Sequence, residues 1–170
     1  MARVGLRHRR FLKDKEAKSF LRGVSGLFGT DVLKLLGQKP RVEVVEFSEG
    51  GVLYIIDGKS SMVGYGGELF PALVHEPLLG MLPFVVVDMG AVPHICNGAD
   101  VMAPGVVDVH GEFKVGTLVV VRDERHSKAI AVGRALVESG EIAEKRRGKV
   151  VRTLHFVGDK PWEAITRFNS

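Results

Sequence analysis

Glycine and proline cut this chain into short apolar runs, and their spacing limits what the chain can fold into. There are 21 glycines and 7 prolines among 170 residues, and glycine is well above its usual share of about 7%. The β-rich runs Val42–Phe47, Val52–Asp57 and Thr117–Val121 are bounded by glycine, proline or polar turns, which is typical of strands joined by tight connections. No apolar run reaches the roughly 20 residues that a membrane span needs. The sequence therefore predicts a turn-rich fold with many short strands and no contact with a membrane.

The first quarter of the chain carries a helical pattern. From Phe11 to Phe28 the apolar residues recur at steps of three and four, which places them on one helical face. Gly29 and Gly37 are suitable helix ends, and Asp31 can cap a second short helix through Leu36. The residues of the apolar face are Phe20, Leu21, Val24, Leu27 and Phe28.

The pattern after this helix predicts a hairpin and then a domain boundary. Glu49-Gly50-Gly51 lies between the first two β-rich runs, and a third strand is expected near Ser60–Val63. Pro71 and Pro77 leave room only for a short helix in Phe70–Leu79. Gly80–Pro83 is a connector, so we expect an α+β N-terminal domain over residues 1–83 and a second domain over residues 84–170.

The second half predicts a small barrel or sandwich. A buried strand at Phe84–Met89 precedes a short helix within Gly90–Ala99, and Ser139 can N-cap another helix through Lys145. Closely spaced strands with polar turns favour a barrel or a sandwich. The remaining expected strands are Thr117–Val121, Lys128–Val132 and Val150–Val157.

Positive charge is concentrated in two segments although the net charge is only +4. Residues 1–22 hold eight basic and two acidic residues, a net charge of +6, and residues 145–152 hold five basic residues and no acid. Such patches are typical of phosphate-binding surfaces. A solvated face supported by ion pairs is the alternative, and the sequence leaves both open.

The sequence contains no set of residues that would make an enzyme. Cys96 is the only cysteine, so no intrachain disulfide forms, which fits a reducing, cytoplasmic setting. The six histidines do not pair at i, i+4 on a predicted helix, as a zinc protease motif requires. His94 and Cys96 are two residues apart, but we interpret Cys96 as a small buried residue. Gly64–Gly67 lacks the spacing of a nucleotide loop, so we expect no catalytic residues, no metal and no cofactor.

Residues Val87–Val106 carry a recognisable signature. Asn97–Val106 reads Asn-Gly-Ala-Asp-Val-Met-Ala-Pro-Gly-Val, which resembles the (S/N)-G-A-(D/N)-(V/L)-(M/L)-x-P-G-(V/I) segment of the PUA domain, named after pseudouridine synthases and archaeosine transglycosylases. Gly116–Val121 and Ala129–Gly133 resemble the later strands of that family. The two-part layout, with its basic start and His155-Phe156 near the last strand, is similar to archaeal PUA proteins and to eukaryotic translation proteins of the malignant-T-cell-amplified-sequence type.

This resemblance implies an RNA-binding pseudo-barrel of about six strands with short helices. The eukaryotic relatives act in translation initiation and ribosome recycling together with a partner protein, and other relatives use the domain to hold RNA beside an enzyme. For this chain, the resemblance implies a non-catalytic protein that recognises tRNA or rRNA. The small ribosomal subunit or a translation-factor protein is then expected as a further partner. A protein-binding adaptor, or an accessory subunit of an RNA-modification enzyme, is the alternative.

The expected RNA site combines small residues with basic ones. Glycine and alanine let backbone N–H groups approach a phosphate or a base edge. Short polar side chains add hydrogen bonds, and basic side chains supply the salt-dependent part of the affinity. Turns and helix caps are the alternative explanation for the glycines and for Asp88 and Asp100. The small and polar candidates are Gly90, Ala91, Asn97, Gly98, Ala99, Asp100 and Gly105; the basic candidates are Arg122, Arg125, Arg134, Arg146, Arg147, Lys149 and Arg152.

Overall fold

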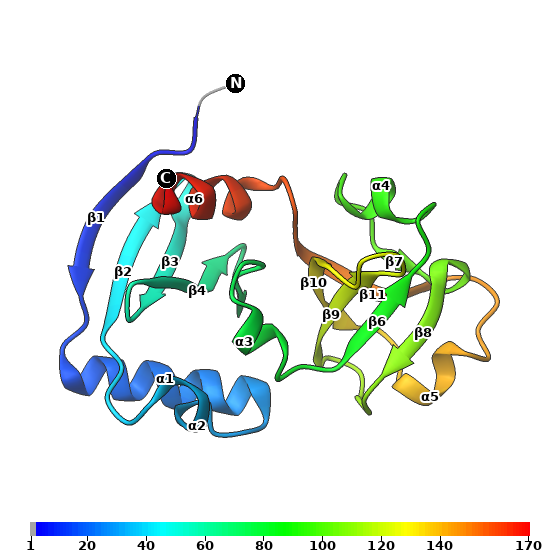
Figure 1. Ribbon diagram of the computed structural model, residues 1–170, viewed down its shortest axis with the longest axis horizontal. Helices are drawn as coiled ribbons and strands as arrows, with labels where there is room; N and C mark the ends of the chain where they lie inside the picture. Colours follow the sequence, from blue (N-terminus) through cyan, green and yellow to red (C-terminus); the bar gives the residue numbers. More distant parts are fainter. Residues whose placement is uncertain (1–2) are drawn as a thin grey trace. The chain divides into compact units, whose positions relative to one another are not determined.

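The structure is a computed structural model that describes residues 3–170. It divides into two compact units: the chain up to Met81 together with Lys160–Ser170, and Leu82–Asp159 (Figure 1). Each unit has its own sheet. Among the described residues, no helix combines the length and the apolar character needed to cross a lipid bilayer.

The first unit is built on a five-stranded antiparallel sheet in the order β1-β2-β3-β4-β5. The predicted hairpin and third strand are present, and Phe47 pairs with Gly51 across a turn (η1, Ser48–Gly50) in which Glu49 and Gly50 have positive φ values of 66° and 77°. The strands are β1 (Leu6–Phe11), β2 (Val42–Phe47), β3 (Gly51–Ile56), β4 (Lys59–Tyr65) and β5 (Glu68–Pro71).

Helix α1 (Asp14–Phe28) packs on one face of this sheet through the predicted apolar residues. Leu21 and Val24 are buried, and the ring of Phe20 stacks on that of Tyr54 with centroids 4.1 Å apart. The helix ends at Gly29, whose φ of 71° lets its N–H bond back to the Ser25 carbonyl. The Asp31 carboxylate accepts a hydrogen bond from the Leu33 N–H at the start of α2 (Leu33–Leu36).

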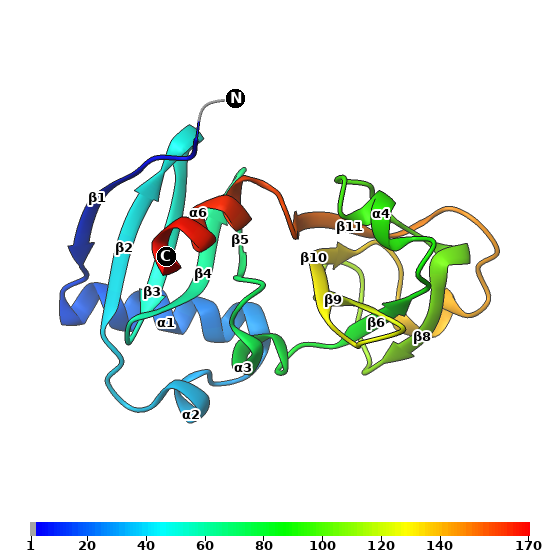
Figure 2. The same cartoon turned by 45° about the horizontal axis from the view of Figure 1, so that its top comes forward.

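Residues Lys160–Ser170 do not belong to the second unit, contrary to the sequence-based division at residues 84–170. All but the last of them form α6 (Lys160–Asn169), which contacts β1, β3 and β4 of the first unit (Figure 2). The Ser60 hydroxyl and the Asn169 side-chain oxygen are 3.1 Å apart, and the Lys160 ammonium pairs with Glu49. No local pattern predicts this return, because Ser60 and Glu49, which bond to α6, lie 109 and 111 residues from their partners in the chain.

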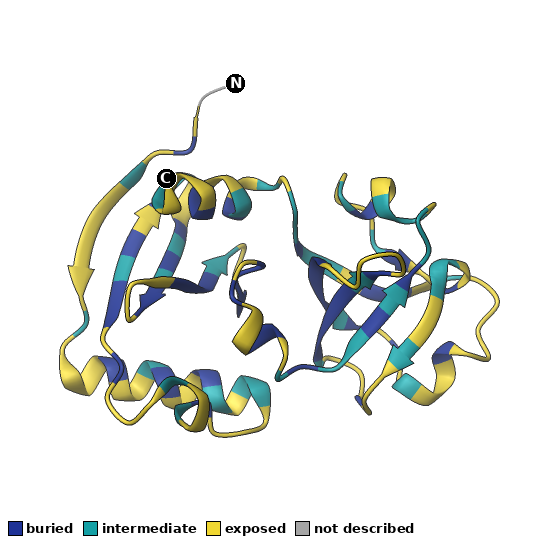
Figure 3. Ribbon diagram, in the orientation of Figure 1, coloured by how far each residue is buried: buried dark blue, intermediate teal, exposed yellow. Residues whose placement is uncertain are grey.

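Two strands of the first sheet were not predicted. β1 lies in a segment with no alternation of apolar and polar residues, and all but one of its residues are exposed (Figure 3). It is an edge strand defined by pairing with β2, with a bulge between Arg7 and Arg10. β5 occupies the start of the expected helical segment, and the helix itself is reduced to α3 (Glu76–Leu79).

The second unit is a six-stranded sheet in the order β7-β11-β10-β9-β6-β8, which confirms a β-rich domain of about six strands. β6 pairs in parallel with β9 and antiparallel with β8, so the sheet does not follow chain order. The strands are β6 (Phe84–Val87), β7 (Val101–Met102), β8 (Val106–His110), β9 (Leu118–Asp123), β10 (Ala129–Ala135) and β11 (Lys149–Phe156).

The core of the second unit is built mainly from residues of these strands. Val85, Val87, Val119, Val121 and Val151 are 0% exposed and belong to one cluster. Burying such side chains contributes about 1.5–3 kcal/mol each. The short helices α4 (Val92–Ile95) and α5 (Ser139–Ile142) and the turn η2 (Ala103–Gly105) join the strands.

The expected capping role of Ser139 is wrong. The N-cap position of α5 is Glu138, and the Ser139 hydroxyl accepts a hydrogen bond from the Phe113 N–H at 3.0 Å. Phe113 is buried in the core cluster, so Ser139 stabilises the chain between β8 and β9 instead of a helix end.

Candidate nucleic-acid interface

The segment after β6 is held in a fixed turn. One Asp88 carboxylate oxygen accepts a hydrogen bond from the Ala91 N–H at 2.8 Å, and the Asp88 N–H donates to the Gly105 carbonyl at 2.9 Å. Together they lead the chain directly into α4 and bring η2 alongside. The cap-like role of Asp88, which the sequence left as an alternative, is therefore what the structure shows.

Gly98 and Gly105 have different reasons to be glycine. Gly98 has a φ of 95°, a backbone conformation that L side chains rarely adopt. A Cβ on Gly105 would lie 3.1 Å from the Ala91 Cβ, a contact tight enough that the two segments would have to move apart slightly. Gly98 is exposed and Gly105 is half-buried. Gly105 is thus explained by close packing, and Gly98 by the turn that follows α4.

The small and polar residues around α4 form one exposed surface. We define the α4 surface as Gly90, Ala91, Asn97, Gly98 and Ala99; all are exposed except Ala91, which is half-buried. Within residues 3–170 the Asn97 side chain takes part in no hydrogen bond or ion pair, and its amide is exposed to solvent. The segment is therefore not covered by other elements of its unit.

Asp100 ties the α4 surface to β11. One of its carboxylate oxygens accepts a hydrogen bond from the Thr153 N–H at 2.9 Å, and the other lies 3.0 Å from the Lys149 ammonium. The Thr153 hydroxyl in turn donates to the Ala99 carbonyl at 2.9 Å. The carboxylate of Asp100 is thus used within the protein, which supports the turn-forming alternative over a direct contact with RNA.

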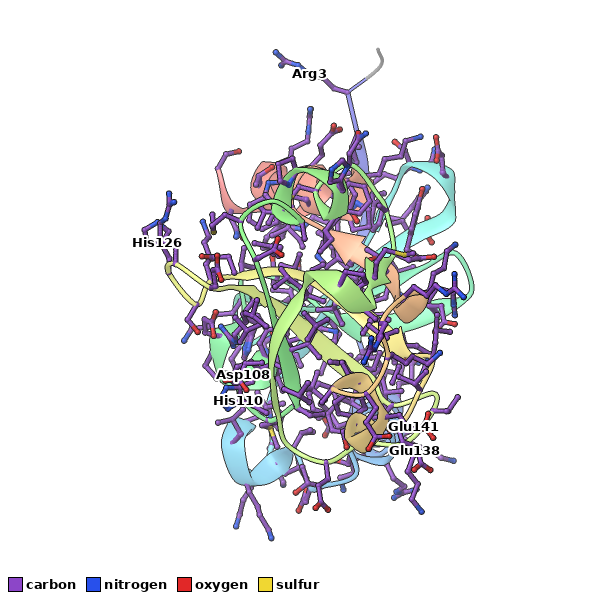
Figure 4. The ribbon with its side chains drawn as sticks, turned by 90° about the vertical axis from the view of Figure 1, so that its right-hand side faces the viewer. Arg3, Asp108, His110, His126, Glu138 and Glu141 are labelled. Atoms are coloured by element: carbon purple, nitrogen blue, oxygen red, sulfur yellow. The ribbon has the colours of Figure 1, made fainter. Side chains whose placement is uncertain are left out.

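The turn between β9 and β10 is anchored beside the Asp88 turn. The Glu124 N–H donates to the Val87 carbonyl at 3.0 Å, and the Met89 N–H donates to the Glu124 carboxylate at 3.3 Å. Because β6 and β9 run parallel, their carboxyl ends meet at this edge of the sheet. Arg125 and His126 are exposed on the turn, and Figure 4 shows His126 projecting outward from it.

Asp123 fixes the shape of that turn from inside. Its side chain is 4% exposed and accepts hydrogen bonds from the N–H groups of Arg125 (2.9 Å), His126 (2.6 Å) and Lys128 (3.0 Å). Burial raises the pKa of the Asp123 carboxyl, but the three backbone donors outweigh it and hold that pKa below its usual value. An ionised, fully bonded Asp123 therefore holds Arg125 and His126 in place next to the α4 surface.

A second basic flank lies on the other side of η2. Lys149 pairs with Met102 in the sheet, and the Ala103 N–H donates to the Gly148 carbonyl at 2.8 Å. Arg146 and Arg147 precede these residues and are exposed. Within residues 3–170, neither of them nor Arg125 takes part in an ion pair. The structure thus brings these three arginines and Lys149 to the segments that border the α4 surface.

The other three basic candidates lie elsewhere on the sheet. Arg122, Arg134 and Arg152 alternate with the core residues Val121, Ala135 and Val151, so their side chains leave the opposite face. Arg122 donates to the Ser127 carbonyl at 3.0 Å and lies over the Phe84 ring, and Arg134 donates to the Gly116 carbonyl at 2.7 Å. Arg152 lies opposite Arg134 and also has interactions within the protein. All three side chains interact within the protein on that face of the sheet, so they do not belong to the α4 surface.

Sequence reasoning missed two contributors to this region. Asp159 accepts hydrogen bonds from the His155 ring at 2.9 Å and from the Phe156 N–H at 3.0 Å, and the Phe156 ring packs next to Gly98. The i, i+4 spacing of His155 and Asp159 could have predicted this contact from the sequence. Glu124 was the other omission, since nothing in its sequence context marks a contact with the Asp88 turn.

Cys96 does not have the surroundings of a nucleophile. It is half-buried against the core cluster, and burial raises the pKa of its thiol, so the thiolate is disfavoured. His94 lies on the exposed side of α4. Over the described part of the chain, no cluster of three or more histidine, cysteine or carboxylate side chains is arranged to hold a metal ion.

Comparisons with known proteins agree with this architecture. Residues 83–157 match the family model of the PUA domain. An uncharacterized protein of Methanocaldococcus jannaschii is 36% identical over 160 residues, which are 92% of this chain and 96% of that protein. Translation machinery-associated protein 20 of Saccharomyces cerevisiae is 28% identical over 137 residues, 76% of this chain and 75% of that protein.

A solved structure shares the fold of the whole chain. The crystal structure of a hypothetical protein from Pyrococcus horikoshii superposes with a TM-score of 0.78 at 34% identity, covering 93% of this chain and 99% of that one. The similarity therefore extends through both units.

Proposed function

Since this chain belongs to the family of PUA-domain proteins, with relatives that share both of its units, we propose that it is a non-catalytic RNA-binding protein of the translation system. Its ligand is tRNA or rRNA, and it acts in the cytoplasm with the small ribosomal subunit or a translation factor as partner. The similarity to a yeast translation machinery-associated protein supports this setting.

One observation carries the proposal: an exposed, small-residue surface borders two segments in which Arg125, Arg146 and Arg147 have no carboxylate partner among residues 3–170. Small residues let an unpaired nucleotide or a 2′-hydroxyl reach backbone groups near Gly98 and Ala99, and this is how folded RNA is recognised in the absence of a readable major groove. Arg125 on one flank and Arg146 and Arg147 on the other supply phosphate contacts.

The residues of the site divide into contact and support. The contact residues are the α4 surface together with Arg125, Arg146, Arg147 and Lys149. Asp88, Asp100 and Gly105 support that surface through hydrogen bonds and close packing. Arg122, Arg134 and Arg152 contribute to the general positive field rather than to direct contacts.

The test is a titration of the full chain with labelled tRNA and with a small-subunit rRNA fragment, at about 50 mM and about 200 mM salt. We expect binding that weakens steeply with salt for at least one of the two RNAs. Absence of binding at low salt, or affinity that does not change with salt, would contradict the proposal.

The adaptor and accessory-subunit alternatives predict a different result. In either case the chain would be retained by a protein partner, or by an RNA-modification enzyme, without RNA. Recovery of such a complex after nuclease treatment, together with no tRNA or rRNA binding, would favour those alternatives.

A further inference from the structure

A groove in the first unit lies between α1 and the segment that leads into β2. Its volume is about 650 Å³, within the roughly 300–1,000 Å³ of small-molecule sites. The floor is apolar and mostly buried, and the rims are polar. The floor residues are Leu12, Ala17, Leu21, Pro40 and Val42.

The rims of this groove are electropositive. Lys18 and Arg22 come from α1, and Lys39 and Arg41 come from the facing segment. Four cations against two carboxylates, Asp14 and Asp31, leave a net charge of +2 along the groove. All six side chains are exposed, and among residues 3–170 none of the four cations is in an ion pair. This charge suits an anionic ligand.

A flat stacking pair stands at one end of the groove. Phe11, the last residue of β1, is 51% exposed, and the Arg41 guanidinium carbon lies 4.3 Å from the centroid of its ring. Nucleobases stack on aromatic rings and on guanidinium planes. Both members of the pair line the groove, so a stacked base would have its phosphate near the cationic rims.

We infer that this groove binds an unpaired nucleotide of an RNA strand. The base stacks on the Phe11–Arg41 pair, and the phosphate is held by Lys18, Arg22 and Lys39. The choice of RNA as the ligand rests on the function proposed above, but the groove is a separate site in the other unit. An acidic peptide would match the charge, but its Asp and Glu side chains have no aromatic ring to stack on the Phe11–Arg41 pair.

The experiment is an NMR titration of the ¹⁵N-labelled full chain with adenosine 5′-monophosphate, in which the chemical shifts of the backbone amides are measured. Adenosine and inorganic phosphate serve as separate probes. We expect shifts confined mainly to residues 11–22 and 38–42, and tighter binding of the nucleotide than of either part.

Two variants and one matched control define the site. Phe11→Leu keeps apolar bulk but removes the ring, and we expect nucleotide affinity to fall about fivefold or more. Lys18→Glu should weaken binding as well, because it reverses a charge at the rim. Lys15→Glu changes an exposed lysine of the same helix that does not line the groove, and affinity should stay close to that of the unaltered chain.

The inference is overturned if the groove resonances do not move, or if Phe11→Leu and Lys18→Glu bind the nucleotide normally. It is also overturned if a glutamate peptide displaces the nucleotide and binds equally well to Phe11→Leu, since the groove is then a site for acidic protein. Replacing Arg146, Arg147 and Lys149 with alanine should weaken tRNA binding and leave nucleotide binding in the groove unchanged. If the chain binds tRNA but the groove resonances do not respond to the nucleotide, only this inference fails and the proposed RNA-binding function stands.

Discussion

The two basic segments of this chain look alike in sequence and differ in the fold. In residues 1–22, Arg9 lies 2.7 Å from Glu43 and over the Phe168 ring, and Arg10 faces Glu16. In residues 145–152, Arg146 and Arg147 are exposed, and within the described chain neither has a carboxylate partner. Arg9 and Arg10 of the first segment are therefore used within the protein, whereas Arg146 and Arg147 of the second segment remain available to a ligand. A cation within a basic run is thus available to a ligand only where the fold brings no carboxylate to that particular side chain.

The largest expected effect is a difference in RNA affinity between variants of the two basic segments. The triple variant Arg146→Ala, Arg147→Ala and Lys149→Ala should bind tRNA or rRNA about 10- to 100-fold more weakly, and the slope of log affinity against log salt should flatten by about 2. The comparison variant Arg7→Ala, Arg9→Ala and Arg10→Ala should lose less than about threefold. Titrations at several salt concentrations measure both, and an equal loss in the two variants would remove the distinction.

The next effect concerns the anchored turn. Asp123→Ala leaves three backbone N–H groups without their acceptor and should lower the free energy of unfolding by about 2–3 kcal/mol, as measured by urea denaturation. Arg125 would then no longer be held beside the α4 surface, so RNA affinity should also fall. A stability equal to that of the unaltered chain would show that water replaces the carboxylate at no cost.

The same residue makes stability depend on pH with a defined sign. The folded-state pKa of Asp123 is held below its unfolded value of about 3.9, so its contribution is complete above that pH. It is lost as the pH falls through the folded-state pKa. The stability difference between the unaltered chain and Asp123→Asn should therefore shrink in acid; a difference that is constant from neutral pH downward would contradict this.

A smaller effect distinguishes two glycines of the second unit. Gly98→Ala places a Cβ on a residue with φ near 95° and should cost about 1–2 kcal/mol. Gly140→Ala is the matched control, because Gly140 lies in α5 with no atom within 4 Å of the added Cβ and no positive φ. That change should be neutral or slightly stabilising. Equal shifts in melting temperature for both variants would rule out backbone strain as the reason for Gly98.

The smallest effects lie within the N-terminal segment itself. Arg9→Ala removes the partner of Glu43, whose side chain is only 11% exposed, and should cost about 0.5–1 kcal/mol. Arg10→Ala breaks a solvent-exposed contact of 3.4 Å with Glu16 and should not move the urea midpoint measurably. The reverse ranking would show that burial of Glu43 is not what gives the Arg9 pair its value.

Local patterns predicted most of the fold. The α1 periodicity, the hairpin at Glu49–Gly51 and the signature from Asn97 to Val106 each depend on neighbours in sequence. The structure contains the helix and the hairpin, and the signature segment forms β7 and the turn η2. The elements that escaped prediction depend on distant partners. β1 is a strand only because β2 lies beside it, and α6 packs on β1, β3 and β4, which lie far earlier in the chain.

The candidate site also divides into residues that local sequence predicts and residues whose roles depend on distant partners. Gly90, Asn97 and Gly98 could be picked out, because the signature itself is local. The separation of Arg146 and Arg147 from Arg134 and Arg152 could not, because strand register decides which face a side chain leaves. The acceptor roles of Asp100 and Glu124 also required knowing which strands meet at one edge.

Amide hydrogen exchange of the full chain with and without bound tRNA tests the central claim most directly. Protection is predicted in residues 88–100, 124–128 and 145–149, because RNA would cover the α4 surface and both of its basic flanks. If tRNA binds and these three segments exchange at the same rates as in the free protein, the α4 surface is not where this chain holds RNA.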